Sequence, residues 1–114
     1  MFKWLKNLLA PAENMFGGER DPRWRDVRAE HVLKEPVCQA CGKTSKLDVH
    51  HIVPVAIDKT RELDPGNLIT LCNQPCHLVF GHFMSYYCYN SDVRKMVAEY
   101  RQALENRKCM PGKT

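Results

Sequence analysis

The sequence has no apolar run long enough to cross a membrane. Its apolar N-terminal stretch, residues 1–9, falls far short of the roughly 20 residues that a membrane-spanning helix needs, and no secretory cleavage site follows it. We therefore expect a cytoplasmic protein without a membrane partner. Phe2, Leu5 and Leu9 recur at helical spacing, which favours a short helix that docks on the domain or contacts a partner protein.

Strong net charge is missing too. The 114 residues carry 17 basic and 13 acidic side chains, which gives a formal net charge of +4. Residues 38–90 contain four residues of each sign and are neutral overall, so any attraction of phosphate to this segment has to come largely from a bound cation. Most of the excess positive charge lies in residues 91–114, with six basic against three acidic residues.

The six cysteines are not accompanied by the secretory signal that a disulfide-stabilised extracellular domain would carry. Four of them form two closely spaced pairs, Cys38 with Cys41 and Cys72 with Cys76, which indicates metal binding in a reducing compartment. Four thiolates complete a tetrahedral Zn²⁺ site and leave no position for water, so we expect a structural ion. A redox-active couple is disfavoured because no thioredoxin-like βαβ pattern surrounds Cys38.

The length of the chain fits one small domain, of a size at which a structural metal helps stability. We expect an N-terminal amphipathic arm and linker over residues 1–20 and the domain over residues 21–114. Of the two unpaired cysteines, we expect Cys88 to be buried and Cys109 to be exposed, and we assign neither a catalytic role.

Hydrophobic periodicity and turn residues predict an α+β arrangement. Strands over residues 46–53 and 67–71 should pair antiparallel, and a helix should begin at residue 75 or 76. Helices over residues 22–34 and from a cap at residues 90–92 to about residue 106 flank this unit. The last helix carries an apolar stripe that we expect in the core, formed by Val93, Met96, Val97, Tyr100 and Leu104.

The first predicted strand contains two adjacent histidines, His50 and His51. Neighbouring side chains of a strand point to opposite faces, so one imidazole can bind a metal ion while the other accepts a proton. The alternative is a polar strand end in which both rings only form hydrogen bonds.

The order of motifs along the chain resembles the HNH endonuclease family. Cys38-Gln39-Ala40-Cys41 precedes the histidine pair, and Asn67 and Cys72-Asn73-Gln74-Pro75-Cys76-His77 follow it. The resemblance implies a small ββα-metal (His-Me finger) domain with a four-cysteine zinc knuckle and flanking helices. The segment Leu78-Val79-Phe80-Gly81-His82 is similar to a subgroup common in phage genomes, which would place the protein in a bacterial host or a phage-infected cell.

The resemblance also implies a metal-dependent endonuclease that hydrolyses phosphodiester bonds in DNA, with RNA as the less favoured substrate. His50 and His77 would hold a catalytic divalent ion, Mg²⁺, Mn²⁺, Ni²⁺ or Zn²⁺. His51 would be the general base, clear of the metal and of the core. Asn67 would hold the loop between the strands so that the base ring is oriented.

Two residues are candidates for a third ligand of this ion. His82 lies five residues beyond His77, so an undistorted helix would turn it away. Asp48 lies two residues before His50 and therefore on the same strand face, although an exposed strand carboxylate is the simpler interpretation.

The second cysteine pair departs from the family pattern. Three residues separate Cys72 and Cys76 where two are common. An i, i+4 pair on a helix still shares a face, but the spacing leaves open which of Cys76 and His77 binds which ion.

The predicted helix before the first cysteine pair is rich in arginine. Arg23, Arg25 and Arg28 are the expected nucleic-acid contacts, since arginine binds phosphates without reading sequence. The alternative is a solvated face that neighbouring carboxylates partly neutralise. For the whole chain, the rival interpretation is a non-catalytic, zinc-stabilised DNA-binding module or phage packaging accessory, but such a module has no need of His51 beside His50.

Overall fold

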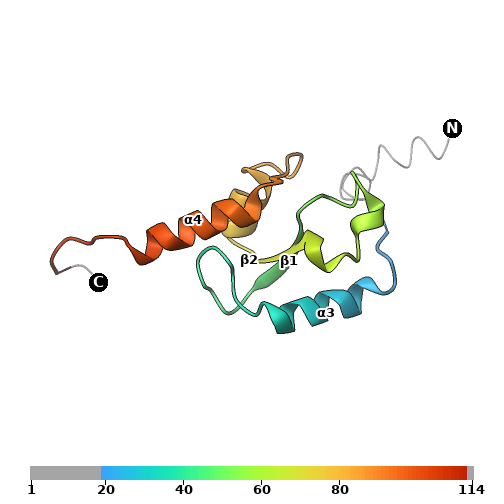
Figure 1. Cartoon of the computed structure of the whole chain (residues 1–114), viewed down its shortest axis with the longest axis horizontal. Coiled ribbons are helices and arrows are strands. Elements are labelled where there is room, and N and C mark those ends of the chain that lie inside the picture. Colours follow the sequence, from blue (N-terminus) through green and yellow to red (C-terminus); the bar gives the residue numbers. More distant parts are fainter. Residues whose placement is uncertain (1–18, 113–114) are drawn as a thin grey trace.

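The computed structural model of the chain describes residues 19–112, so the expected N-terminal arm lies almost wholly outside the described residues. The elements are, in order, α3 (Trp24–Lys34), β1 (Leu47–His51), the 3₁₀ turns η1 (Lys59–Arg61) and η2 (Pro65–Asn67), β2 (Leu68–Cys72), the π-helix η3 (His77–Gly81) and α4 (Val93–Glu105) (Figure 1). The predicted α+β class with a ββα-metal arrangement is confirmed. Within the described part, no helix is long and apolar enough to span a membrane.

The sheet consists of β1 and β2, which pair antiparallel as predicted, with His50 opposite Ile69 and His51 opposite Leu68. Every residue of β2 is buried, whereas only the last three residues of β1 are buried. The two adjacent histidines therefore lie in the best-covered part of β1, next to the loop that connects the strands.

The core lies between the sheet, the start of η3 and α4, and it includes three cysteines. Its buried members are Cys38, Ala40, Ile69, Leu71, Cys72, Cys76, Val93 and Val97. Val93 and Val97 confirm the first part of the predicted stripe on α4, but Tyr100 is 39% exposed, so its expected core position is wrong. The helix α4 runs past the sheet (Figure 1), and the Tyr100 ring packs on the partly buried ring of Phe80, with centroids 4.9 Å apart.

Arginine side chains fasten α4 to the rest of the domain. Arg94 donates to the backbone oxygen of Leu68 at 2.7 Å and to the carboxylate of Glu35 at 3.0 Å. Arg101 donates to the backbone oxygen of Cys38 at 3.0 Å. Part of the positive charge of residues 91–114 therefore holds α4 against the rest of the domain, which composition alone did not indicate.

Candidate active site and metal centres

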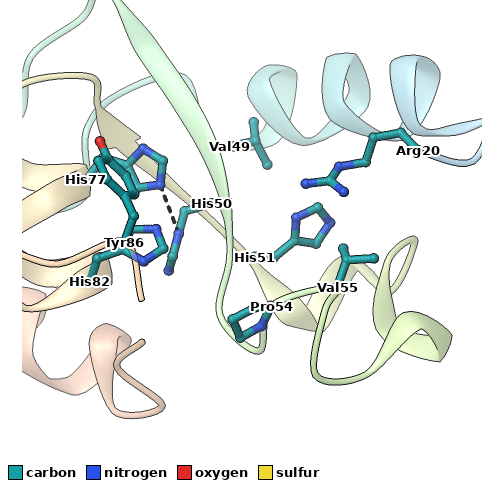
Figure 2. Close-up of a pocket in the computed structure, with 9 residues that line it drawn as sticks. All are labelled: Arg20, Val49, His50, His51, Pro54, Val55, His77, His82 and Tyr86. Atoms are coloured by element: carbon teal, nitrogen blue, oxygen red, sulfur yellow. Dashed lines mark hydrogen bonds between the residues drawn. The ribbon is translucent and has the colours of Figure 1, made fainter. Parts of the chain in front are cut away.

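Three histidines, one from β1, one from η3 and one directly after η3, meet at one point (Figure 2). One ring nitrogen of each of His50, His77 and His82 lies within 4.8 Å of the corresponding atoms of the other two. The expectation that the helix turns His82 away is wrong, because residues 77–81 form a π-helix. Its wider turn places residue i+5 over residue i, and the rings of His77 and His82 have centroids 5.0 Å apart.

His50 sits at the centre of this histidine cluster and is only 3% exposed. Its Nδ1 lies 3.0 Å from Nε2 of His77, and its Nε2 is buried without a hydrogen-bond partner among the described residues. Burial, and then the charges of His77 and His82, lower the pKa of His50 from 6.5 to about 2. The ring is therefore neutral, as a metal ligand must be.

The other two rings have their tautomers set by acceptors. Asp48 accepts a hydrogen bond from Nδ1 of His77 at 2.9 Å, and the backbone oxygen of Cys88 accepts one from Nδ1 of His82 at 2.8 Å. Both rings therefore carry the lone pair on Nε2. Asp48, a candidate third ligand from the sequence, instead orients His77, and His82 is the third member of the cluster.

The backbone of Gly81 lies close against this cluster. A Cβ atom at Gly81 would lie 3.1 Å from Nε2 of His50 and 3.2 Å from Cδ2 of His77. One ring nitrogen from each of the three histidines lies within 4.8 Å of the other two, so one divalent ion could reach all three rings. The cluster thus fits a divalent transition ion, and an orphaned buried nitrogen gives it a reason to bind one.

His51 occupies the other face of β1. Its Nε2 donates to the backbone oxygen of Glu62 at 2.9 Å, which leaves Nδ1 as the basic nitrogen, and its ring packs on Trp24 with centroids 4.4 Å apart. The side chain is buried, although His51 is not part of the hydrophobic core cluster. Burial lowers the pKa of His51 and the charge of Arg20 adds to this, against an opposing effect of the Glu62 hydrogen bond.

Asn67 fastens the loop that contains the backbone carbonyl of Glu62. Its Oδ1 accepts from the backbone nitrogen of Val53 at 2.8 Å, while its Nδ2 donates to the backbone oxygens of Val53 at 3.0 Å and Arg61 at 3.2 Å. Arg61 immediately precedes Glu62, so the amide fixes the position of the acceptor that orients His51. This is the arrangement that the sequence resemblance implied for Asn67.

Both faces of β1 open into one pocket of about 290 Å³. It is lined by Arg20, Val49, His50, His51, Pro54, Val55, His77, His82 and Tyr86 (Figure 2). Tyr86 is a lining residue that no sequence motif selected, and Arg20 belongs to the arginine-rich stretch but was not expected to line this pocket. Arg20 comes just before the predicted helix, and Tyr86 follows the last recognised motif, so only the tertiary fold connects them with the histidines.

The arginines predicted to contact nucleic acid lie outside this pocket. Arg23, Arg25 and Arg28 are exposed on or beside α3. Arg23 forms a two-point contact with Asp21, through its Nη2 at 2.9 Å and its Nε at 3.1 Å, and Arg28 donates weakly to the backbone oxygen of Leu47 at 3.4 Å.

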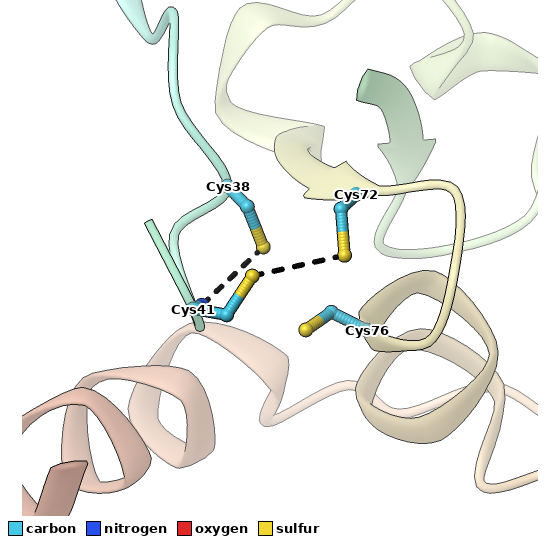
Figure 3. A group of neighbouring side chains, drawn as sticks. All are labelled: Cys38, Cys41, Cys72 and Cys76. Carbon is cyan, nitrogen blue, oxygen red and sulfur yellow. Dashed lines mark hydrogen bonds between the residues drawn. The ribbon is translucent and has the colours of Figure 1, made fainter. Parts of the chain in front are cut away.

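The four paired cysteines form a second, separate cluster (Figure 3), with all four sulfurs within 4.8 Å of one another. The sulfurs of Cys41 and Cys72 are 3.8 Å apart. Two sulfurs that bind a tetrahedral zinc ion at about 2.3 Å are separated by nearly the same distance. Cys72 ends β2 and Cys76 directly precedes η3, so the pair brackets the turn between the strand and the helix. Cys76 belongs with the cysteines and His77 with the histidines.

Burial opposes ionisation of three thiols of this cluster. Burial raises the pKa of Cys76 and of Cys72. Burial also opposes ionisation of Cys38, but hydrogen bonds from backbone N–H groups outweigh it and lower the pKa of Cys38 from 9.0 to about 7. A bound ion supplies the charge that holds all four as thiolates. Cys88, predicted to be buried, is exposed like Cys109.

The four-cysteine cluster, which we call the clamp, gives the first prediction. Because structural zinc contributes on the order of 10 kcal/mol to folding, Cys38→Ser should give a largely unfolded chain with no tightly bound zinc. Circular dichroism and metal analysis of the purified variant measure this. Cys88→Ser and Cys109→Ser, at exposed positions, are matched controls that should keep both fold and zinc, and a native spectrum for zinc-free Cys38→Ser would contradict the clamp.

The histidine cluster gives the second prediction. Replacement of His82 by alanine should weaken the binding of Ni²⁺ or Mn²⁺ by at least about ten-fold. Loss of a residue that only supports a metal ligand already lowers metal affinity by about this factor. Titration calorimetry on zinc-loaded protein measures the affinity. His31→Gln removes a histidine outside the cluster and should leave it unchanged; equal affinities for wild type and His82→Ala would remove His82 from the site.

Comparison with known proteins identifies the central part of the chain. The family model of the HNH endonucleases matches residues 38–79, which contain both cysteine pairs, the adjacent histidines, Asn67 and His77. Searches of curated proteins and of solved structures found no match. The matched segment ends three residues before His82, and it holds the two strands and the four-cysteine cluster described above. Residues 38–79 of this chain are therefore similar to the HNH endonuclease domain.

Proposed function

We propose that the protein is a metal-dependent endonuclease that hydrolyses phosphodiester bonds in DNA. The observation that carries the proposal is the shared pocket: a neutral, oriented His51 opens into the same space as the three-histidine cluster. A phosphate bound at the cluster would share this pocket with the basic nitrogen of His51. Hydrolysis needs this combination of a proton acceptor and a group that neutralises phosphate charge.

His51 acts as the general base. Its Nε2 hydrogen is held by the backbone oxygen of Glu62, so Nδ1 takes the proton from the attacking water. The charge that then develops on the ring is stabilised by the same carbonyl. Asn67 positions the carbonyl through the loop and is a positioning residue, as it does not touch the reacting atoms.

His50, His77 and His82 hold the divalent ion, and Asp48 keeps His77 in its binding tautomer. The ion, when bound, would act as a Lewis acid that neutralises negative charge on the scissile phosphate and on the leaving oxygen. Its physiological identity is proposed only as one of Mg²⁺, Mn²⁺, Ni²⁺ and Zn²⁺, while Zn²⁺ is proposed for the cysteine clamp.

Arg20 adds fixed positive charge to the pocket. It lines the wall next to His51 (Figure 2) and lies close enough to affect the pKa of that ring. A guanidinium there can contact the phosphate that is cut. Arg23, Arg25 and Arg28 would extend the contact along the backbone of the DNA without reading its sequence.

The binding module remains the second candidate, and the packing of His51 favours it. A histidine that is 8% exposed and covers Trp24 has a structural use whether or not it takes a proton. Activity has to be separated from fold and from DNA affinity to decide between the two.

The third prediction makes that separation. His51→Gln keeps a side chain that can donate to the Glu62 carbonyl but removes the base, so cleavage of supercoiled plasmid should slow by about 10² to 10⁴. Zinc content and DNA affinity should stay at wild-type values. His51→Ala should lose as much rate and also some stability, because it leaves a void beside Trp24. Equal cleavage by wild type and both variants would contradict the role of His51.

The fourth prediction concerns the arginines on and beside α3. Replacing Arg23, Arg25 and Arg28 together by glutamine should weaken binding to all DNA sequences alike and flatten the salt dependence by about one unit per lost contact. Fluorescence anisotropy across a salt series measures the slope. Lys108→Gln, a single charge change on the C-terminal tail, is the control. An unchanged slope in the triple variant would assign these arginines to a solvated face.

A further inference from the structure

Exposed aromatic and apolar side chains are concentrated in the segment that follows the histidine cluster. Of nine large apolar residues exposed within residues 19–112, five lie between residues 83 and 89: Phe83, Met84, Tyr86, Tyr87 and Tyr89. We call residues 83–89 the aromatic segment. Single exposed apolar residues are ordinary, whereas a concentration of them marks a binding surface.

The composition of this segment excludes one kind of contact. From His77 to Asn90 the chain contains no lysine, arginine, aspartate or glutamate, yet it holds three of the four tyrosines of the protein. The aromatic segment therefore offers no ion pair to a phosphate or to a charged protein partner. Its chemistry is that of flat, weakly polar rings.

The segment is fastened to the candidate metal site at three points. The Tyr86 ring lies 4.8 Å from the ring of His82 and lines the pocket (Figure 2). The backbone oxygen of Cys88 accepts the hydrogen bond of His82, and Asn90 closes the segment with bonds to the backbone oxygens of Gly81 at 3.1 Å and Phe80 at 2.9 Å.

The backbone at the start of the segment is unusual as well. Phe83 and Met84 have φ angles of 51° and 73°, a region that bulky side chains rarely adopt. Such conformations persist where the surrounding contacts impose them, and they gather at functional sites. Here they turn the chain sharply after His82, and both side chains stay at least half exposed.

We propose that the aromatic segment binds unpaired bases of single-stranded DNA next to the phosphate that is cut. The inference rests on the proposed nuclease function and adds the substrate class, DNA that is single-stranded or locally unpaired. Aromatic side chains stack on any base whose face is free, without sequence preference. In a duplex those faces are covered by neighbouring bases, so stacking requires an unpaired strand. Because the Tyr86 ring lies 4.8 Å from the His82 ring and lines the same pocket, a base that flanks a phosphate at the cluster would come next to it.

The test measures affinity without catalysis. Binding of labelled oligothymidylate and of a duplex of equal length is followed by fluorescence anisotropy, without added divalent ion, for wild type, Tyr87→Ala and Tyr87→Phe. Tyr87 is 81% exposed and lies outside the proposed catalytic groups, so its replacement should leave the fold intact, as circular dichroism can verify. Leu33→Ala is the matched control, since Leu33 is 82% exposed on α3.

We expect Tyr87→Ala to lower affinity for the single strand by about 5- to 150-fold, the range of one lost stacking contact. Duplex affinity should change far less, Tyr87→Phe and Leu33→Ala should bind like wild type, and the salt slope should stay the same because no charge is removed. Unchanged single-strand affinity in Tyr87→Ala would overturn the inference. So would an equal loss for single strand and duplex, or a concentration-dependent dimer that Tyr87→Ala abolishes while its DNA affinity stays intact.

Failure of this inference is distinguishable from failure of the nuclease proposal. If wild-type protein cuts plasmid with an added ion but Tyr87→Ala keeps its single-strand affinity, the aromatic segment has been assigned wrongly and the nuclease stands. If stacking is found but wild type cuts no DNA with any ion, the base-binding surface stands and its placement beside a scissile phosphate is overturned.

Discussion

The four-cysteine clamp is the constraint on which the rest of the structure depends. Three of its four sulfur-bearing residues belong to the buried core, so the ion site and the hydrophobic core are one unit. Cys72 is the last residue of β2 and Cys76 the last before η3. By joining these two points, the clamp fixes where the strand ends and the helix begins. His77 is the next residue, so its position is set by the clamp directly.

The two faces of β1 then separate the two chemical roles. His50 turns toward η3, where His77 and His82 lie with tautomers set by Asp48 and by the Cys88 carbonyl. His51 turns toward Trp24 and the Glu62 carbonyl. Burial lowers the pKa of both rings and keeps them neutral. In one case neutrality suits metal binding, and in the other it suits acceptance of a proton.

Much of this arrangement could be predicted from sequence because its signals are local. Strand periodicity gave the hairpin, and the spacing of cysteines, histidines and Asn67 gave the clamp and the members of the matched domain. His82 could not be placed, because an α-helical period was assumed where the chain forms a π-helix. Tyr100 lies on a helix that extends past the sheet, and Cys88 lies in the exposed segment after η3, so the burial expected of both is wrong. Arg20 and Tyr86 reach the pocket only through tertiary contacts.

We propose a division of roles in which one ion holds the fold together while a second, exchangeable ion supports hydrolysis. It is tested most directly by measuring zinc content and plasmid cleavage on one sample after brief treatment with a chelator. The account predicts that one zinc per chain is retained, that cleavage stops, and that an added divalent ion restores it. Cleavage that persists in the chelator, or that disappears only together with the zinc of the clamp, would contradict the account.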